Sequence, residues 1–411
     1  MASRGDRSSS RFLLSASLAM ALGLVPLVVV LSIADGMIEG ISNRTIETSL
    51  YHVQVWPTGP QSLDRAALRA QLVGRLSSLP GFRGLWPELP GFALAYSPRG
   101  RLGMTVRGID PRWAADDRGA ARYLHAVAGA LALGSPDEVW IGKEAATKLG
   151  LSVGDSLKLL TTRSKGTLTV PRVTTVRVAA VVSVGYQELD RLWLFAPLDL
   201  TAGLFDPGES PVFWGIQADG PLDRTPAFLA DVRRALGTGW QAVSWQTTGR
   251  SQFLNYQATR ALLAVVMALV LLVAAVNVST AMVTTVRERR RETAILKALG
   301  ASDRLVRGQF LVLGLGAGLA GTAVGLGAGV AVAAAVNPLV ILVDRLVTLA
   351  NPGTGFHLLD SAYYLESIPV KFDPLVLGAA ALGSVTLALL ASWWPARRAS
   401  RERPLETLRR S

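Results

Sequence analysis

Side chains that could carry out chemistry are few and widely separated in this chain. It contains no cysteine, and its three histidines, His52, His125 and His357, lie far apart in the sequence. This distribution excludes a disulfide framework and a thiol nucleophile, and it argues against a histidine-rich metal site. No Ser/His/Asp arrangement and no catalytic pair of carboxylates stands out. We therefore expect no catalytic residue, no metal site and no cofactor in this chain.

A nucleotide-binding loop is also missing. The P-loop requires Gly-x-x-x-x-Gly-Lys-Ser/Thr, because its backbone N–H groups and its lysine hold the phosphates. The Gly142-Lys143 pair lacks the earlier glycine and is followed by Glu144. The chain is therefore not expected to bind a nucleotide in this manner.

The composition indicates a membrane protein. Half of the 411 residues are hydrophobic and 18% are charged. Four stretches contain no Asp, Glu, Lys or Arg, namely residues 12–34, 261–286, 308–343 and 374–396. Each exceeds the roughly 20 residues that a helix needs to cross the hydrocarbon core. A purely cytosolic enzyme is excluded, and we expect transmembrane helices over residues 12–34, 261–286, 308–336 and 374–395.

The distribution of basic residues predicts the orientation of these helices. Short cytoplasmic loops collect Lys and Arg, and basic residues are concentrated in residues 1–11, 287–307 and 396–411. These three segments are therefore expected in the cytoplasm, with residues 35–260 and 337–373 on the other side. The net charge of +12 mostly reflects this orientation signal and does not indicate nucleic-acid binding.

The first apolar stretch has an alternative interpretation as a cleaved signal peptide. Its 23 uncharged residues exceed the usual apolar region of about 7–15 residues. The segment around Asp35 and Gly36 is a poor cleavage site. We therefore expect a retained span, in which Pro26 either kinks the helix or is tolerated.

The large insert, residues 35–260, is expected to be an α+β domain. Its patterns predict strands over residues 51–56, 102–109, 156–161 and 240–245, and helices over residues 63–79, 144–149 and 226–236. Ser62 is the expected N-cap of the first helix. Residues 167–184 are rich in Val and Thr and predict a hairpin arm, which Pro171 restricts to an edge or a protrusion.

The segment that follows the second span is the most informative part of the sequence. Residues 290–302 read RRETAILKALGAS, and we expect the span to continue into them as a helix that ends at Gly300. Apolar side chains on a cytoplasmic loop need a cover. Either a partner protein or the neighbouring spans would supply it.

The third span carries glycines at a spacing that permits close helix packing. Gly314, Gly318, Gly321, Gly325 and Gly329 form small-xxx-small pairs. They predict packing within the bundle or, alternatively, a dimer seam.

Because no span contains an internal charge of the kind expected in a proton-coupled carrier, we expect a subunit that another chain drives.

Several motifs together resemble one family. The order of a span, a large insert and three spans, with RRETAILKALGAS after the second span, resembles the FtsX/MacB superfamily of ABC transporter permeases. Other segments resemble its lipoprotein-releasing, Lol-type members: VVLSIADG at 29–36, GYQELD at 185–190, VAAVNVS at 273–279, YYLESIPV at 363–370, WPARRAS at 394–400 and PLETLR at 404–409. We therefore expect a chain without the fused ATPase domain of MacB-type proteins and without the longer N-terminal extension of FtsX-type proteins.

The resemblance implies a type VII ABC permease fold with four transmembrane helices, in the bacterial inner membrane. Two permease chains, identical or different, would work with separate ATPase subunits that bind ATP and Mg²⁺. The coupling residues would be Arg291, Glu292, Ile295, Leu296, Lys297, Leu299, Gly300, Ala301 and Ser302. A cavity for the acyl chains of a lipoprotein would be lined by Pro26, Val29, Val30, Ile33, Met37, Leu263 and Met267.

The same resemblance implies partners on the periplasmic side. A lipoprotein would pass to a periplasmic carrier. A hairpin that contains Arg163, Lys165, Pro171 and Arg172 would bind this carrier. Alternatively, the hairpin is only a solvated edge of the domain. The alternative functions are a MacB-like mechanotransmission efflux pump and FtsX-like signalling to a cell-wall hydrolase. A membrane-bound enzyme is the least favoured of these functions, because the sequence shows no catalytic arrangement of residues.

Overall fold

The structure, a computed structural model, describes residues 2–59, 64–165, 168–206, 211–220, 222–350 and 368–400 of the chain. Its contacts divide the chain into two compact units. The helical unit comprises residues 1–38, 255–343 and 368–411, and the sheet unit comprises residues 39–254 and 344–367. Most of the large insert thus forms a unit of its own.

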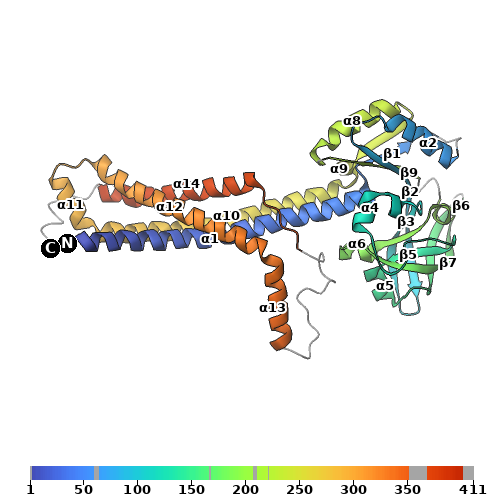
Figure 1. Cartoon of the computed structure of the whole chain (residues 1–411), viewed down its shortest axis with the longest axis horizontal. Helices are drawn as coiled ribbons and strands as arrows, with labels where there is room; N and C mark the ends of the chain where they lie inside the picture. Colours follow the sequence, from blue (N-terminus) through green and yellow to red (C-terminus); the bar gives the residue numbers. More distant parts are fainter. Residues whose placement is uncertain are drawn as a thin grey trace. The chain divides into compact units, whose positions relative to one another are not determined.

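Long helices build the helical unit (Figure 1). Its helices are α1 (Ala2–Thr45), α10 (Arg250–Glu288), α11 (Arg290–Ala298), α12 (Asp303–Ala334), α13 (Val336–Ala350) and α14 (Pro374–Ser400), of which α1, α10 and α13 extend into the sheet unit. In the described part of the chain, four helices are long and apolar enough to cross a membrane, as the charge-free stretches predict. α1 is continuous through Pro26. The expected loop at residues 337–373 contains α13 in its first part.

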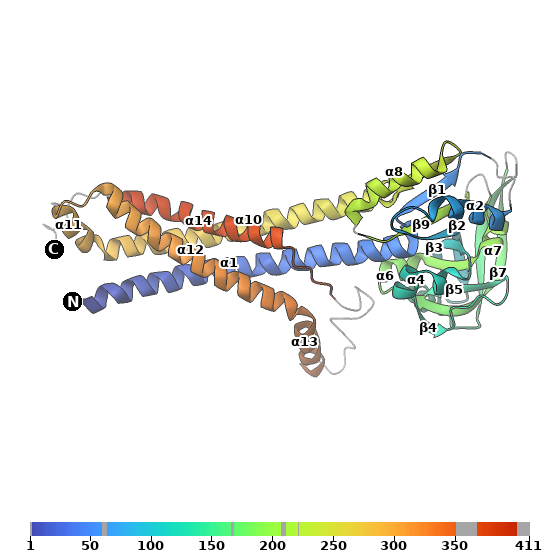
Figure 2. The ribbon, with the colours of Figure 1, turned by 45° about the horizontal axis from the view of Figure 1, so that its top comes forward.

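The glycines of α12 bring three helices together. α12 lies against α14 and α1 (Figure 2). A Cβ atom at Gly314 or Gly318 would lie within 3 Å of Ser392 or Ala388 of α14. At Gly321 and Gly329 it would meet α1 at a similar distance. Of the two alternatives for this stripe, the structure shows packing within the chain.

The sheet unit is built on a ten-stranded mixed sheet. Its strands are β1 (Val53–Pro57), β2 (Phe82–Ser97), β3 (Gly100–Ile109), β4 (His125–Gly129), β5 (Glu138–Gly142), β6 (Ser156–Lys165), β7 (Leu168–Ser183), β8 (Trp193–Pro197), β9 (Phe213–Ala218) and β10 (Trp240–Ser244). They follow the order β10-β1-β9-β2-β3-β8-β5-β7-β4, and β6 pairs with β2 and β7. The pairs β3–β8 and β5–β7 are parallel, and the other pairs are antiparallel.

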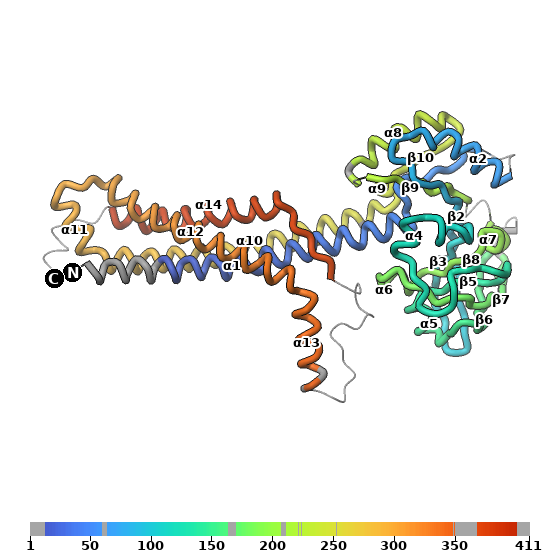
Figure 3. The backbone as a smooth tube through the Cα atoms, viewed as in Figure 1, coloured from blue at the N-terminus to red at the C-terminus, as the bar shows by residue number. Residues whose placement is uncertain are grey.

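Short helices complete the sheet unit and confirm the α+β fold class. They are α2 (Arg65–Leu76), α3 (Trp113–Asp116), α4 (Arg118–Tyr123), α5 (Lys143–Leu149), α6 (Gln187–Leu192), α7 (Leu198–Leu204), α8 (Thr225–Leu236) and α9 (Trp245–Thr248), with the π-helix η1 (Ile46–Leu50) and the 3₁₀-helix η2 (Leu222–Arg224). α2 and α8 lie side by side (Figure 3). Their buried faces, with Leu72 and Val232, pack on Val55 and Ile216 of the sheet. Apolar residues at helical spacing explain this layer.

Most elements expected in the insert are present, with local differences. α2 begins at Arg65, and its N-cap is Asp64, whose side chain accepts a hydrogen bond from the Arg65 N–H group. The expected cap, Ser62, lies outside the described residues. β6 and β7 form the expected hairpin, in which Pro171 is opposite Thr162. β2 was not foreseen, although it is one of the longest strands.

Candidate functional site

The predicted coupling residues lie together on α11 and the turn after it. α10 ends at Glu288, and α11 begins at Arg290 after Arg289, which has φ −95° and ψ 13°. The expected continuous helix is therefore interrupted at this residue, and α11 turns away from α10 (Figure 1). A short separate helix at the end of a span presents its side chains at the end of the bundle.

Among the apolar residues of α11 and its C-cap, Leu299, one is buried, whereas Ala298 and three larger side chains are exposed. Ala294 is 5% exposed and packs inside the chain. Ile295, Leu296 and Leu299 are 46%, 38% and 81% exposed. The helical unit therefore covers only part of this surface. Three uncovered apolar side chains on one short helix favour a protein partner, and Arg291 and Glu292 are exposed beside them.

The turn after α11 fixes this helix to its neighbours. Gly300 has φ +97°, a left-handed conformation that favours glycine at a helix C-terminus. Ala301 follows it, and the Ser302 side chain accepts a hydrogen bond from the Leu305 N–H group as the N-cap of α12. Lys297 Nζ donates to the Ser400 carbonyl oxygen at 2.6 Å and lies 2.9 Å from Asp303. A displacement of α11 would therefore pull on both α12 and α14.

The predicted cavity residues lie on the outer halves of α1 and α10. Leu263 and Met267 are half-buried, whereas Leu262 and Leu269 are exposed, so one face of α10 is turned toward α1. Met267 packs against a buried cluster of α1 that contains Leu24. On α1, all the predicted positions are half-buried: Pro26, Val29, Val30, Ile33 and Met37. Their role as the lining of a cavity remains a prediction.

An ion pair joins the outer ends of these two helices. Arg260 Nε lies 2.6 Å from Asp35 Oδ1, and its second nitrogen donates to Oδ2 at 3.1 Å. Asp35 is 11% exposed at its side chain, and Arg260 is 46% exposed. No sequence pattern used above predicted this pair. The available signal was that Asp35 directly follows one charge-free stretch and Arg260 directly precedes the next.

The segment before α14 holds the outer end of α1. The Lys371 N–H group donates to the Ser32 carbonyl oxygen at 3.0 Å. A Cβ atom at Gly36 would lie 2.2 Å from the Pro369 carbonyl oxygen, so only glycine allows this approach. The Asn337 side chain exchanges two hydrogen bonds with the backbone of Ile368. Asn337, in the first turn of α13, therefore bonds within the helical unit.

In the sheet unit, the chain leaving α1 enters a buried polar network. Tyr51 has φ +52°, an unusual conformation for a non-glycine residue, and is fully buried. Its hydroxyl donates to Glu88, which forms a bidentate ion pair with Arg107 at 2.6–2.7 Å. Burial raises the pKa of Tyr51, and Glu88 adds to this effect. The Arg107 guanidinium lies over Trp193, 4.6 Å from the ring centroid.

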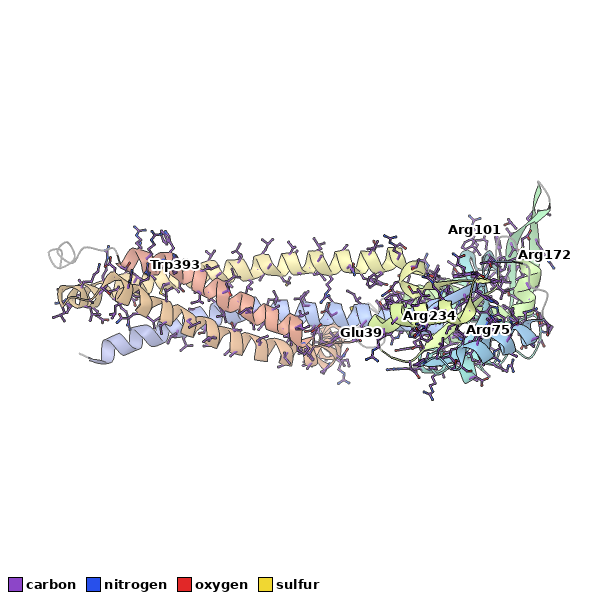
Figure 4. All side chains as sticks on the ribbon, turned by 90° about the horizontal axis from the view of Figure 1, so that it is seen from above. Glu39, Arg75, Arg101, Arg172, Arg234 and Trp393 are labelled. Atoms are coloured by element: carbon purple, nitrogen blue, oxygen red, sulfur yellow. The ribbon has the colours of Figure 1, made fainter. Side chains whose placement is uncertain are left out.

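The predicted carrier hairpin is described only in part. Arg172 donates a hydrogen bond to the Gly203 carbonyl oxygen, which fixes it to the body of the sheet unit (Figure 4). Val170 and Val173 are 46% and 61% exposed. The side chains of Arg163 and Lys165 lie outside the described part of the chain. The structure thus forms a hairpin with exposed valines, and its role as a carrier site remains a prediction.

The GYQELD segment contains a buried carboxyl group. Asp190 accepts hydrogen bonds from the Ser183 hydroxyl at 2.5 Å and from the Val184 N–H group at 2.7 Å. Burial raises the pKa of Asp190 to about 6, although these two hydrogen bonds oppose the shift. Gly185 in turn binds Arg44, whose side chain donates to its carbonyl oxygen. The segment therefore anchors the last turn of α1 within the sheet unit.

Comparison with protein-family models gives two matches that together span most of the chain. Residues 13–224, about half of the chain, match the model of the MacB-like periplasmic core domain. Residues 264–404 match the model of the FtsX-like permease C-terminal region.

Individual proteins extend this similarity. The lipoprotein-releasing system transmembrane protein LolC of Xylella fastidiosa is 25% identical over 402 residues, which are 95% of this chain and 92% of that protein. The corresponding protein LolE of Haemophilus influenzae is 22% identical over 401 residues, with the same 95% and 92% coverage. The crystal structure of the periplasmic region of MacB from Actinobacillus actinomycetemcomitans is 12% identical, with a TM-score of 0.32 over 50% of this chain and 94% of that structure.

Proposed function

Because the chain belongs to the FtsX/MacB superfamily of ABC transporter permeases, we propose that it is the permease subunit of a lipoprotein-releasing transporter. It would use ATP hydrolysis by a separate subunit to extract lipoproteins from the inner membrane and pass them to a periplasmic carrier. The observation that carries the proposal is the similarity to both LolC and LolE along 95% of the chain. The chain itself would act as a permease and not as an enzyme.

The proposed orientation follows from the charges around the spans. Residues 1–11, 287–307 and 396–411 are rich in arginine and would lie in the cytoplasm. The sheet unit would then lie in the periplasm. This arrangement puts α11 on the side where ATP is available.

In the proposed mechanism, the ATPase subunit binds the exposed apolar side chains of α11. Ile295, Leu296 and Leu299 would be covered by this partner, which would hold ATP and Mg²⁺. Lys297 bonds to the end of α14 and lies beside the first turn of α12. A movement of α11 during ATP binding or hydrolysis would therefore reach both spans directly.

At the outer end, the acyl chains of a lipoprotein would enter between α1 and α10. Each CH₂ group moved from lipid to water costs about 0.8 kcal/mol, so an apolar lining lowers the barrier to extraction. The half-buried side chains Val29, Ile33 and Met267 supply such a lining. The Asp35–Arg260 pair lies at its mouth and would have to separate or shift during entry.

Two further partners complete the proposal. A second permease chain, a copy or a relative, would pair with this one, as the existence of both LolC and LolE suggests. The β6–β7 hairpin would meet the periplasmic carrier through its exposed strand residues Val170 and Val173 and through Arg172.

The test is release from liposomes that hold the chain, its ATPase subunit and a triacylated lipoprotein. ATP should bring the lipoprotein into the soluble fraction, bound to added carrier. Leu299→Ala should reduce this release and ATPase binding, because it removes the most exposed of the three large apolar side chains at α11 and its C-cap. The matched control is Leu375→Ala, which removes an equally exposed leucine (84% against 81%) at the other end of the bundle.

The outcomes test the coupling role of α11 and the lipoprotein substrate separately. Normal release by the Leu299→Ala variant would refute the coupling assignment. No release by an assembled complex that hydrolyses ATP would refute the lipoprotein substrate and favour a MacB-like efflux role.

A further inference from the structure

The exposed face of α14 changes its chemistry along its length. Leu375, Leu382 and Leu390 are 84%, 72% and 64% exposed. Trp393 and Trp394 follow at 49% and 59%, and then come the exposed Arg397 and Arg398. The opposite face is buried through Ser392, Pro395, Ala396 and Ala399. Apolar, aromatic and cationic side chains thus succeed one another on one face, as hydrocarbon, interface and headgroups do in a bilayer.

The tryptophans lie at the depth of a membrane boundary. Trp393 is 19 residues after Pro374, the first residue of α14. At about 1.5 Å per residue this is about 28 Å, close to the ~30 Å thickness of the hydrocarbon core. On α12, Arg307 is the last charged residue before the charge-free stretch 308–343. Both helices therefore reach the same boundary, at the end of the bundle that carries α11 (Figure 4).

Each tryptophan ring is covered by an arginine. The Arg307 guanidinium of α12 lies 5.5 Å from the ring centroid of Trp393, and that of Arg398 lies 5.5 Å from the ring centroid of Trp394. Within the described ranges of the chain, neither arginine has an ion pair with a carboxylate. Stacking on an indole occupies the face of a guanidinium and leaves its N–H edge available, and this edge matches the oxygens of a phosphate group.

We propose that the two Arg–Trp pairs, Arg307–Trp393 and Arg398–Trp394, bind the phosphate of an anionic phospholipid in the leaflet next to α11. The indole rings contact the upper acyl chains, and the guanidinium edges bind the phosphate. A lipid fits this surface better than the ATPase subunit does, because the surface continues the exposed leucines of α14, which lie in a helix long and apolar enough to cross a membrane. The exposed leucines of α11 remain for a protein partner.

Brominated lipids test this site directly. Of the 10 tryptophans in the chain, Trp393 and Trp394 are the two outside residues 39–254, so acyl-chain bromine should quench these two selectively. The full chain is placed in nanodiscs of phosphatidylcholine that contain a minor fraction of brominated phosphatidylglycerol or, separately, brominated phosphatidylcholine. We expect stronger quenching by the brominated phosphatidylglycerol. Equal quenching by the two lipids would overturn the proposal.

Variants identify the residues that produce the preference. Arg307→Gln and Arg398→Gln should each reduce the preference for phosphatidylglycerol about fivefold, since one arginine near an anionic surface contributes ~1 kcal/mol. Quenching by phosphatidylcholine should stay unchanged, which shows that the variants are folded and inserted. Arg122→Gln is the matched control, because Arg122 also stacks on an aromatic ring, that of Tyr123 at 5.2 Å, but in the sheet unit.

Two further measurements exclude the other ligands. Free inorganic phosphate should leave the preference for phosphatidylglycerol unchanged. If free phosphate abolished this preference, the site would be assigned to soluble phosphate instead. The arginine variants should still bind the ATPase subunit. Loss of ATPase binding with an intact lipid preference would make this surface part of the protein interface and overturn the proposal. None of these outcomes depends on lipoprotein release.

Discussion

The helices α1 and α10 border the same outer region of the helical unit but are held very differently. In the most apolar window of α1, 44% of the residues are buried inside the chain, against 22% in α10. α1 is fixed through backbone contacts of Ser32 and Gly36 with residues 369–371. The outer part of α10 is held mainly by Met267 and by the Arg260–Asp35 pair. We therefore expect α1 to stay in place and α10 to be the helix that changes position.

Within the sheet unit, the chain next to α1 is also held more firmly than the chain next to α10. The chain leaving α1 is anchored by Arg44 at Gly185 and by Glu47, which pairs with Arg83. Tyr51 then enters the buried Glu88–Arg107 network. The chain entering α10 passes through the short helix α9 and Gly249, with a ring contact between Trp245 and Phe253 at 5.5 Å. Charged and buried contacts hold the first junction, and mainly apolar contacts hold the second.

The largest effect is expected from breaking the network beside Tyr51. Glu88→Gln leaves the Arg107 charge buried without its partner, and removing one member of a buried ion pair costs about 3–5 kcal/mol. The thermal unfolding temperature of the purified full chain should fall accordingly. The matched control is Asp199→Asn, which removes the carboxylate of the exposed pair with Arg65 and should cost less than about 1 kcal/mol. Equal losses in the two variants would mean that burial does not strengthen this anchor.

The second effect concerns the Asp190 cluster that receives Arg44. Because the pKa of Asp190 is raised to about 6 in the folded chain, the folded state binds a proton more tightly than the unfolded state does. The contribution of Asp190 to the stability of the folded state should therefore increase as the pH falls through 6. The gain is complete below about 3.9, the pKa of an aspartate in the unfolded chain. The difference between the pKa values in the folded and unfolded states corresponds to about 3 kcal/mol.

Asp190→Asn should lack this pH dependence. The stability of the variant is compared with that of the parent at each pH. This is necessary because burial lowers the pKa of His52, so that protonation of His52 destabilises the folded state as the pH falls. Thermal unfolding from pH 7 to pH 4 measures the difference. A constant difference between the two proteins across this range would contradict the assignment of the buried carboxyl group.

A third, smaller effect is expected where residues 369–371 cross α1. Gly36→Ala places a methyl group 2.2 Å from the Pro369 carbonyl oxygen, and such overpacking costs about 1–3 kcal/mol. Gly378→Ala in α14 is the matched control, because nothing lies within 4 Å of its Cβ position. The control should be neutral or slightly stabilising, by up to about 1 kcal/mol. Unfolding temperatures in detergent compare the two variants, and equal values would mean that the contact with Pro369 does not restrict the side chain at residue 36.

The sequence predicted features that depend on local pattern or composition. Charge-free stretches predicted four membrane helices, and alternating or helical spacing predicted β3, α5 and α8. The contacts that hold α1 could not be predicted, because they join residues that are distant in the sequence, such as Gly36 with Pro369 and Tyr51 with Glu88. β2 was missed since Pro87 and Pro90 interrupt its pattern, although it pairs along its length with β3 and β9.

The same distinction applies to the candidate site. The coupling role stays a prediction, which rests on the resemblance of the contiguous segment 290–302 to a family motif. The structure places this segment on α11 and the turn after it. The interruption at Arg289 was missed because no glycine or proline marks it. The tether from Lys297 to Ser400 spans about a hundred residues, and no local signal indicates it.

The smallest effect, and the most direct test of the comparison, concerns the Asp35–Arg260 pair. If α10 is the helix that moves, Asp35→Asn should loosen only its outer end. A partly exposed ion pair contributes up to about 1 kcal/mol, so the region between the two helices should open about fivefold more often. Because the chain has no cysteine, Leu263→Cys introduces a unique thiol there, and its reaction rate with a water-soluble maleimide measures the opening. The charge-swapped variant Asp35→Arg with Arg260→Asp should return the rate toward that of the parent, and a cysteine at the exposed Val127 of the sheet unit should react equally in all backgrounds. An unchanged rate at residue 263 in the Asp35→Asn variant would show that packing around Met267, and not the ion pair, holds α10 against α1.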